Sequence, residues 1–290
     1  MRRDPLLERA GRSGARLVLA GGDEEALVAA AALLEEAGIT GVSRVGTGGI
    51  RPDADPRLES VASLLRSRQP GRVTDGIHAL DLAVDPLRFA AALVALGEAD
   101  ALLAGPGVTG PALAELAQWT LGGSQDGGPV ASASWLLLAD DSLVACADCA
   151  LAGGLLPVDR ARLARAAALL HTRISGEAPR VAFLGGPPVQ GGSGALEEAV
   201  QSLGALAPGV SALADDGARF RARANVLIFP DGTAAHLAVR TARALAGVRL
   251  LGPLLLGLPG VMAGVPEDAA AEEVIGTAAL AMLAAGGSGI

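Results

Sequence analysis

Short apolar segments alternate with longer segments of helical pattern along most of the chain, and this alternation constrains the fold more than any other feature. Residues 16–20, 101–104 and 181–184 are short, apolar and uninterrupted, as is typical of buried strands. A segment with a helical pattern follows each of them. Strands and helices that alternate in this way form parallel βαβ units, so the sequence predicts an α/β fold.

The same reading extends over the rest of the chain. The predicted strands are 16–20, 42–45, 101–104, 129–138, 142–150, 181–184, 226–229 and 251–258. The predicted helices are 24–37, 86–96, 111–121, 158–170, 196–203, 234–246 and 269–285. Between residues 45 and 85 the sequence is charged and irregular, so we expect no regular element there. The last helix is apolar nearly all round and must therefore be buried.

A chain of 290 residues has the length of about two ordinary domains. Two glycine- and proline-rich segments, 122–128 and 253–260, suit crossings between domains. We therefore expect a discontinuous first domain of residues 1–127 plus 258–290. The second domain comprises residues 128–257.

The composition excludes several function classes. All 23 basic residues are arginines, so a P-loop lysine and a Schiff-base lysine are both excluded. The net charge is −8 and only 2% of residues are aromatic, which argues against a nucleic-acid-binding surface. The longest uncharged stretch, residues 250–266, contains Pro253 and Pro259 and is too short and too broken for a membrane helix. No apolar run follows the N-terminus before Leu17, so we expect a cytoplasmic protein.

The cysteines and histidines do not indicate a redox or metal site. Cys146 and Cys149 lie three residues apart in a predicted strand, so their side chains point to opposite faces and should not pair. We expect a buried thiol here rather than a redox motif. The histidines His78, His171 and His236 are scattered along the chain, and we expect no metal and no nicotinamide cofactor.

Three glycine-rich turns follow predicted strands directly and precede predicted helices: residues 104–109, 185–194 and 230–233. Such turns expose backbone N–H groups and can bind an anion at a helix N-terminus. The alternative is that the glycines only allow short strand-to-helix turns to close. None of the turns contains a P-loop or a complete dinucleotide fingerprint. The patterns therefore predict no more than an α/β protein with a candidate anion-binding cleft.

Several segments occur in the order seen in one known family. The segment ANVLIFPD (224–231) is the clearest of them. The others are DPL (85–87), LGEAD (96–100), ADCA (147–150), RVAFL (180–184) and EEVIGTAA (272–279). Together they resemble the phosphate acetyl/butyryltransferase family, the phosphotransacetylases.

This resemblance implies two α/β domains of the isocitrate/isopropylmalate-dehydrogenase type with an active site in the interdomain cleft. It also implies a homodimer, which we expect to be built largely from the apolar C-terminal helix and the helices of the middle domain. The implied reaction moves an acyl group between coenzyme A and inorganic phosphate, with coenzyme A as a substrate and without a metal. A carboxylate helps to deprotonate the thiol, and arginines bind phosphate and stabilise the charge that develops on the acyl carbonyl.

The resemblance places Glu273 at the position of the family's catalytic aspartate, so Glu273 is the candidate base. Residues from the glycine-rich turns, one predicted strand and one predicted helix are the candidates for substrate or anion binding. They are Gly105, Gly107, Thr109, Ser132, Ser134, Asp231, His236 and Arg240. Arg223 is a further candidate cation.

The sequence departs from the family pattern where the family has cations. Glu25, Glu115 and Glu267 align with family arginines, Ala95 with a basic residue, and His236 with an asparagine. A reversed unit charge disfavours phosphate by several kcal/mol even at a moderate effective dielectric. Two main hypotheses follow: a phosphate acyltransferase with weakened or lost activity, or an inactive dimeric scaffold or ligand-binding regulator. A third is a cationic or neutral ligand in an acidic cleft.

Overall fold

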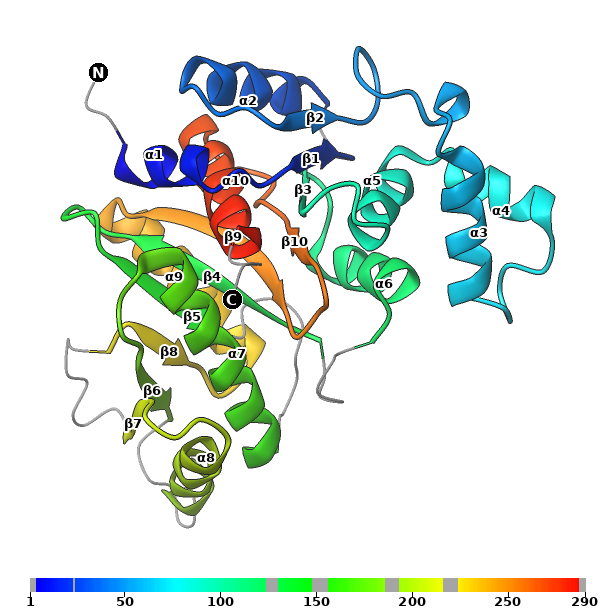
Figure 1. Ribbon diagram of the computed structural model, residues 1–290. Coiled ribbons are helices and arrows are strands. Elements are labelled where there is room, and N and C mark those ends of the chain that lie inside the picture. Colours follow the sequence, from blue (N-terminus) through cyan, green and yellow to red (C-terminus); the bar gives the residue numbers. More distant parts are fainter. Residues whose placement is uncertain are drawn as a thin grey trace. The chain divides into compact units, whose positions relative to one another are not determined.

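The computed structural model describes residues 4–22, 24–123, 130–147, 156–185, 193–215 and 224–286. The chain divides into two compact units, unit 1 (residues 1–123 with 258–290) and unit 2 (residues 124–257) (Figure 1). Each unit contains β-strands covered by helices, so the predicted α/β fold class is confirmed. We propose that these units correspond to the two predicted domains.

The sheet of unit 1 is parallel, with the strand order β2–β1–β3–β10. Its strands are β1 (Leu17–Ala20), β2 (Val42–Arg44), β3 (Ala101–Ala104) and β10 (Val261–Ala263). Every residue of β1 and β3 is buried, which is typical of central parallel strands with helices on both faces. Strand β10 was not predicted, because three residues give too short a pattern to recognise.

Helices α1 (Pro5–Arg12) and α2 (Glu24–Glu36) pack against α10 (Ala271–Ala285), as Figure 1 shows. Helices α5 (Pro86–Ala95) and α6 (Gly110–Thr120) pack against each other and against strands of the same sheet. The predicted burial of the last helix is confirmed, since most of α10 is buried against these elements of unit 1. Its apolar composition is thus explained within one unit and is not an argument for a dimer.

The expectation of an irregular segment between residues 45 and 85 is wrong. This segment contains a 3-10 turn, η1 (Pro52–Ala54), and the helices α3 (Leu58–Arg68) and α4 (Gly76–Ala83), drawn in blue to cyan in Figure 1. A narrow apolar stripe on α3 packs against α5 and α6, and the many charged residues around the stripe hide its period in the sequence.

The sheet of unit 2 is mixed, with the strand order β9–β4–β5–β8–β6–β7. Strands β9 (Arg249–Leu256), β4 (Ala131–Leu137) and β5 (Leu143–Ala147) are antiparallel neighbours, which confirms the two adjacent strands predicted in 129–150. Strands β5, β8 (Val226–Ile228), β6 (Arg180–Leu184) and β7 (Ser211–Asp215) are parallel.

Helix α9 (Gly232–Ala246) covers one face of this sheet, where its residues Ala235 and Val239 pack with Cys146, Ala182 and Leu227. Helices α7 (Pro157–Ser175) and α8 (Ser193–Leu206) pack against each other and against the same sheet. The predicted burial of the Cys146 thiol is confirmed. Cys149 lies outside the described residues.

A buried histidine lies on α7. His171 is 0% exposed, and both of its ring nitrogens are buried without a hydrogen-bond partner among the described residues. Burial lowers the pKa of the His171 imidazole from 6.5 to about 4, because the apolar interior disfavours its charged form. Glu177 opposes this shift and Arg180 adds to it.

This histidine makes the stability of the protein depend on pH. The unfolded chain takes up a proton near pH 6.5 and the folded chain only near pH 4, so the stabilisation is complete above pH 6.5 and is lost as the pH falls towards 4. At pH 4.5 the loss attributable to His171 is roughly 2–3 kcal/mol. We expect His171→Leu to remove this part of the pH dependence in urea unfolding at pH 4.5 and 7.5.

His78→Gln is the matched control, because His78 is exposed and should keep the wild-type pH dependence. Equal losses of stability between pH 7.5 and 4.5 in His171→Leu and in the wild type would contradict the prediction.

Candidate functional site

Two glycine turns meet at the carboxyl end of the parallel sheet in unit 1. The first, Gly21-Gly22, follows β1, and the second begins with Gly105 after β3. The Gly105 N–H donates to the carbonyl of Ala20 at 3.3 Å. Gly22 has a φ of +70°, and a Cβ added there would collide with the carbonyls of Gly105 and Pro106. The turns therefore approach so closely that only glycine fits at this contact.

The turn after β3 also contains three of the candidate ligand-binding residues. Gly105 is buried and serves the close approach, which favours the simple turn-closing interpretation for that residue. Gly107 is exposed, with a φ of +93° and open space where a side chain would be. Thr109 is the N-cap of α6, and its Oγ1 accepts a hydrogen bond from the Ala112 N–H at 3.4 Å. The open face of Gly107 and the start of α6 are the parts of this turn that a ligand could approach.

The candidate base Glu273 lies in the first turn of α10 and is 4% exposed. Its Oε2 accepts a hydrogen bond from the Ala270 N–H at 3.0 Å, which satisfies one backbone donor at the helix start. The Thr277 hydroxyl donates to the backbone carbonyl of Glu273 at 2.7 Å. The local role of this carboxylate is therefore to cap α10.

The remaining candidates belong to unit 2 and fall into two groups. Ser132 and Ser134 are buried within β4, where they pair with residues of β9 and β5.

The second group lies at the start of α9. Asp231 is the N-cap of this helix and accepts a hydrogen bond from the Ala234 N–H at 2.8 Å. His236 and Arg240 are exposed on the same helix, four residues apart and thus on one face. The structure therefore brings the last three to one helix and leaves the serines inside the sheet. Arg223 lies outside the described residues.

The carboxylates that align with family arginines are exposed. Glu25 lies in the first turn of α2, and Glu267 lies between β10 and α10. Glu115, on α6, pairs with Arg72 at 3.6 Å, and the Arg72 guanidinium lies 5.5 Å from the centre of the Trp119 ring. An arginine from a neighbouring segment thus partly neutralises Glu115 at the helix surface.

The sequence reasoning missed Arg160, on α7. It is 8% exposed, and its Nη2 donates to the backbone carbonyls of Leu184 at 3.1 Å and Phe229 at 3.5 Å. Those residues end β6 and follow β8, so the guanidinium lies at the carboxyl end of both strands. The sequence could have indicated its burial, because Arg160 lies at helical spacing from Ala164 and Ala167, two apolar residues on the buried face of α7.

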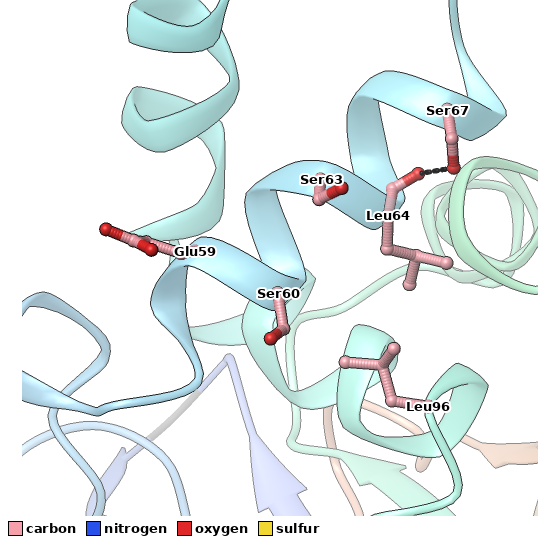
Figure 2. A pocket seen from close by; sticks show the side chains of 6 residues that line it. All are labelled: Glu59, Ser60, Ser63, Leu64, Ser67 and Leu96. Carbon is pink, nitrogen blue, oxygen red and sulfur yellow. Dashed lines mark hydrogen bonds between the residues drawn. The ribbon is translucent and has the colours of Figure 1, made fainter.

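A surface hollow of about 430 Å³ lies over α3 and the end of α5, away from the strand ends (Figure 2). It is lined by Glu59, Ser60, Ser63, Leu64, Ser67 and Leu96. Figure 2 shows the Ser67 hydroxyl donating to the carbonyl of Leu64, at 2.8 Å. Since a carboxylate is the only charged group in the lining, this hollow does not suit phosphate.

Within the described residues, no group of three or more histidine, cysteine, aspartate or glutamate side chains is placed to hold a metal ion. None of the described helices is both long and apolar enough to span a membrane.

The contact between the two glycine turns can be tested by adding one methyl group. Gly22→Ala places a Cβ against two backbone carbonyls in addition to straining a positive φ, so we expect it to lower the free energy of unfolding by roughly 2–4 kcal/mol. Gly14→Ala is the matched control, with a φ of +67° and open space around it. It should lose only about 1 kcal/mol, and equal losses in urea unfolding would show that the turns do not touch.

Comparison with known proteins gives a consistent result. The family model of phosphate acetyl/butaryl transferase matches residues 1–208 and 200–282. A phosphate acetyltransferase of Paracoccus denitrificans is 29% identical over 286 residues, which cover 88% of this chain and 90% of that protein.

Solved structures show the same fold. The EutD phosphotransacetylase from Staphylococcus aureus has a TM-score of 0.80 at 20% identity, covering 97% of this chain and 98% of that chain. The 4-hydroxythreonine-4-phosphate dehydrogenase from Klebsiella pneumoniae has a TM-score of 0.57 at 17% identity, covering 94% of this chain and all of that one, and it has the predicted isocitrate/isopropylmalate-dehydrogenase-like fold. Because the family model spans nearly the whole chain, the protein belongs to the phosphate acetyl/butaryl transferase family.

Proposed function

We propose that this protein transfers an acyl group between coenzyme A and inorganic phosphate, at a rate well below that of ordinary enzymes. The observation that carries the proposal is the match of the family model over almost the entire chain. A relative that is named a phosphate acetyltransferase and aligns with 88% of the chain supports it further.

In the forward reaction a phosphate oxygen attacks the thioester carbonyl, the C–S bond breaks, and coenzyme A leaves as its thiolate. In the reverse reaction a carboxylate takes the proton of the thiol. Glu273 is the candidate for that proton transfer. Its Oε2 already accepts a hydrogen bond from the Ala270 N–H, so part of the acceptor capacity of the carboxylate is used at the start of α10. This reduced capacity is one reason to expect slow turnover.

Charge is the second reason. Glu25, Glu115 and Glu267 are exposed carboxylates at positions where the family resemblance leads us to expect arginines. Each carboxylate repels phosphate and the phosphates of coenzyme A, and none can stabilise negative charge on the acyl carbonyl. Loss of one such donor typically lowers the rate by about 10²–10³. An inactive scaffold is the second candidate function, and these same carboxylates favour it.

The rate can be tested by measuring the release of coenzyme A from acetyl-CoA and butyryl-CoA in the presence of phosphate. We expect a wild-type turnover well below about 1 s⁻¹, the low end for working enzymes. We expect Glu115→Arg/Glu267→Arg to raise it, because two repulsive charges become attractive. The double variant also breaks the ion pair between Arg72 and Glu115, whereas Glu267→Arg alone keeps it. The single variant therefore measures the effect of the charge at position 267 by itself.

Glu35→Arg/Glu36→Arg is the matched control, since it makes the same change of net charge at two exposed positions at the end of α2. It should leave turnover unchanged. Wild-type turnover of about 1 s⁻¹ or more would contradict the proposed weakening. No turnover in any variant would instead support the inactive scaffold.

We also propose a homodimer, as the family resemblance implies. Light scattering at micromolar concentration should then give twice the chain mass of 28.7 kDa. A single-chain mass under those conditions would contradict the proposal.

A further inference from the structure

Arg160 is a buried cation for which the described residues provide no carboxylate partner. The residue is 8% exposed, and no described carboxylate lies within ion-pair distance of its guanidinium. Its hydrogen bonds to described residues both start from Nη2, and its Nε–H is buried without an acceptor. The ring of Phe183 lies 5.8 Å from the guanidinium carbon.

Such a group is costly in a folded protein. Burial lowers the pKa of the Arg160 guanidinium, and no carboxylate of the described residues opposes the shift, yet arginine stays charged in proteins. Buried charges are normally paired or bound to a ligand, because two carbonyl hydrogen bonds do not replace the water that is lost. A buried arginine with no carboxylate partner among the described residues therefore favours an anionic ligand as the missing partner.

Two described carboxylates, one beside Arg160 on α7 and one at the start of α9, are already engaged. Asp159 pairs with Arg162 at 3.0 Å. Asp231 accepts the Ala234 N–H at the start of α9. Neither lies within 4.0 Å of Arg160, so neither of these described carboxylates neutralises its charge.

The position of Arg160 is one where α/β proteins bind ligands. Its guanidinium touches the carbonyl of Leu184, which ends β6, and that of Phe229, which follows β8. Ligands of open α/β sheets lie beyond the carboxyl ends of the strands. Helix α9 begins three residues after Phe229 and presents its N-terminus at the same end of β8, which favours negative charge.

We propose that Arg160 is the central cation of a phosphoryl-binding site at the carboxyl ends of β6 and β8 in unit 2. The choice of a phosphoryl group among anions rests on the proposed function, because phosphate and coenzyme A both carry one. The planar guanidinium suits phosphate oxygens, to which arginine makes charge-assisted hydrogen bonds. The site concerns binding and does not require that the protein turn over.

The test compares binding of inorganic phosphate, coenzyme A and pantetheine, which lacks phosphate, by calorimetry at constant ionic strength. The variant is Arg160→Met, which keeps the aliphatic stem and removes the charge. Arg162→Met is the matched control, because it removes a charge two residues away on the same helix from a more exposed arginine. We expect Arg160→Met to weaken binding of a phosphoryl ligand at least about tenfold and Arg162→Met to change it less than about twofold.

The ligands separate the two sources of the phosphoryl group. If Arg160→Met loses affinity for inorganic phosphate alone, the site binds that substrate. If it loses affinity for coenzyme A alone, the site binds the phosphates of coenzyme A. The affinity for pantetheine should be the same in the wild type and the variant. A purely structural role of Arg160 would lower the unfolding temperature without changing the affinity of the folded protein. If Arg160→Met does not fold, Arg160→Lys replaces it. Lysine keeps the positive charge but lacks the planar guanidinium with its two parallel N–H groups, so we expect a smaller loss of affinity.

Equal affinities in the wild type and the folded Arg160 variant, or no binding of phosphate or coenzyme A by the wild type, would overturn the proposal. These outcomes are distinct from failure of the acyltransferase reaction, since binding is measured without turnover. A protein that turns over with an affinity indifferent to Arg160 would overturn this inference alone.

Discussion

The close approach of two glycine turns at the carboxyl end of β1 and β3 is the contact on which the rest of unit 1 depends. It brings Gly22 against the carbonyls of Gly105 and Pro106, and α2 and α6 begin shortly after the two turns. Residue 22 has no room for a side chain at this contact. Gly107, in the second turn, is exposed and has open space where a side chain would be.

Three exposed carboxylates of unit 1 and one buried arginine of unit 2 differ in what their charges cost in folding. In unit 1, Glu25, Glu115 and Glu267 remain exposed, where solvent screens them and their cost to folding is small. In unit 2, Arg160 is buried at the strand ends and its charge has no carboxylate partner among the described residues. The exposed carboxylates of unit 1 therefore cost little in folding, whereas the buried Arg160 has carbonyl hydrogen bonds and the Phe183 ring, but no described carboxylate, around its guanidinium. Anion binding and acyl transfer should therefore be measured separately.

Much of the fold could be predicted from the sequence because its pattern is strong. Strands such as β1 and β3 are wholly apolar, and the alanine-rich helix α10 could only be buried. Helix α3 could not be predicted, since its apolar stripe is narrow and lies among polar and charged residues, and α4 has only eight residues, too few for a clear helical period. Of the candidate site residues, the Gly105–Thr109 turn and the caps Thr109 and Asp231 follow from local rules for strand-to-helix turns.

By itself, the sequence determined the α/β class, the order of most elements and the exclusion of lysine chemistry, because periodicity and composition are local properties. Only the tertiary structure decided that Glu273 caps α10 with little exposure, that Glu115 pairs with Arg72, and that Arg160 meets the ends of two strands. The Arg72 pair and the Arg160 hydrogen bonds join residues far apart along the chain, and the low exposure of Glu273 comes from the packing around α10. Burial and pairing, which set the energy of a charge, are fixed only when those contacts form.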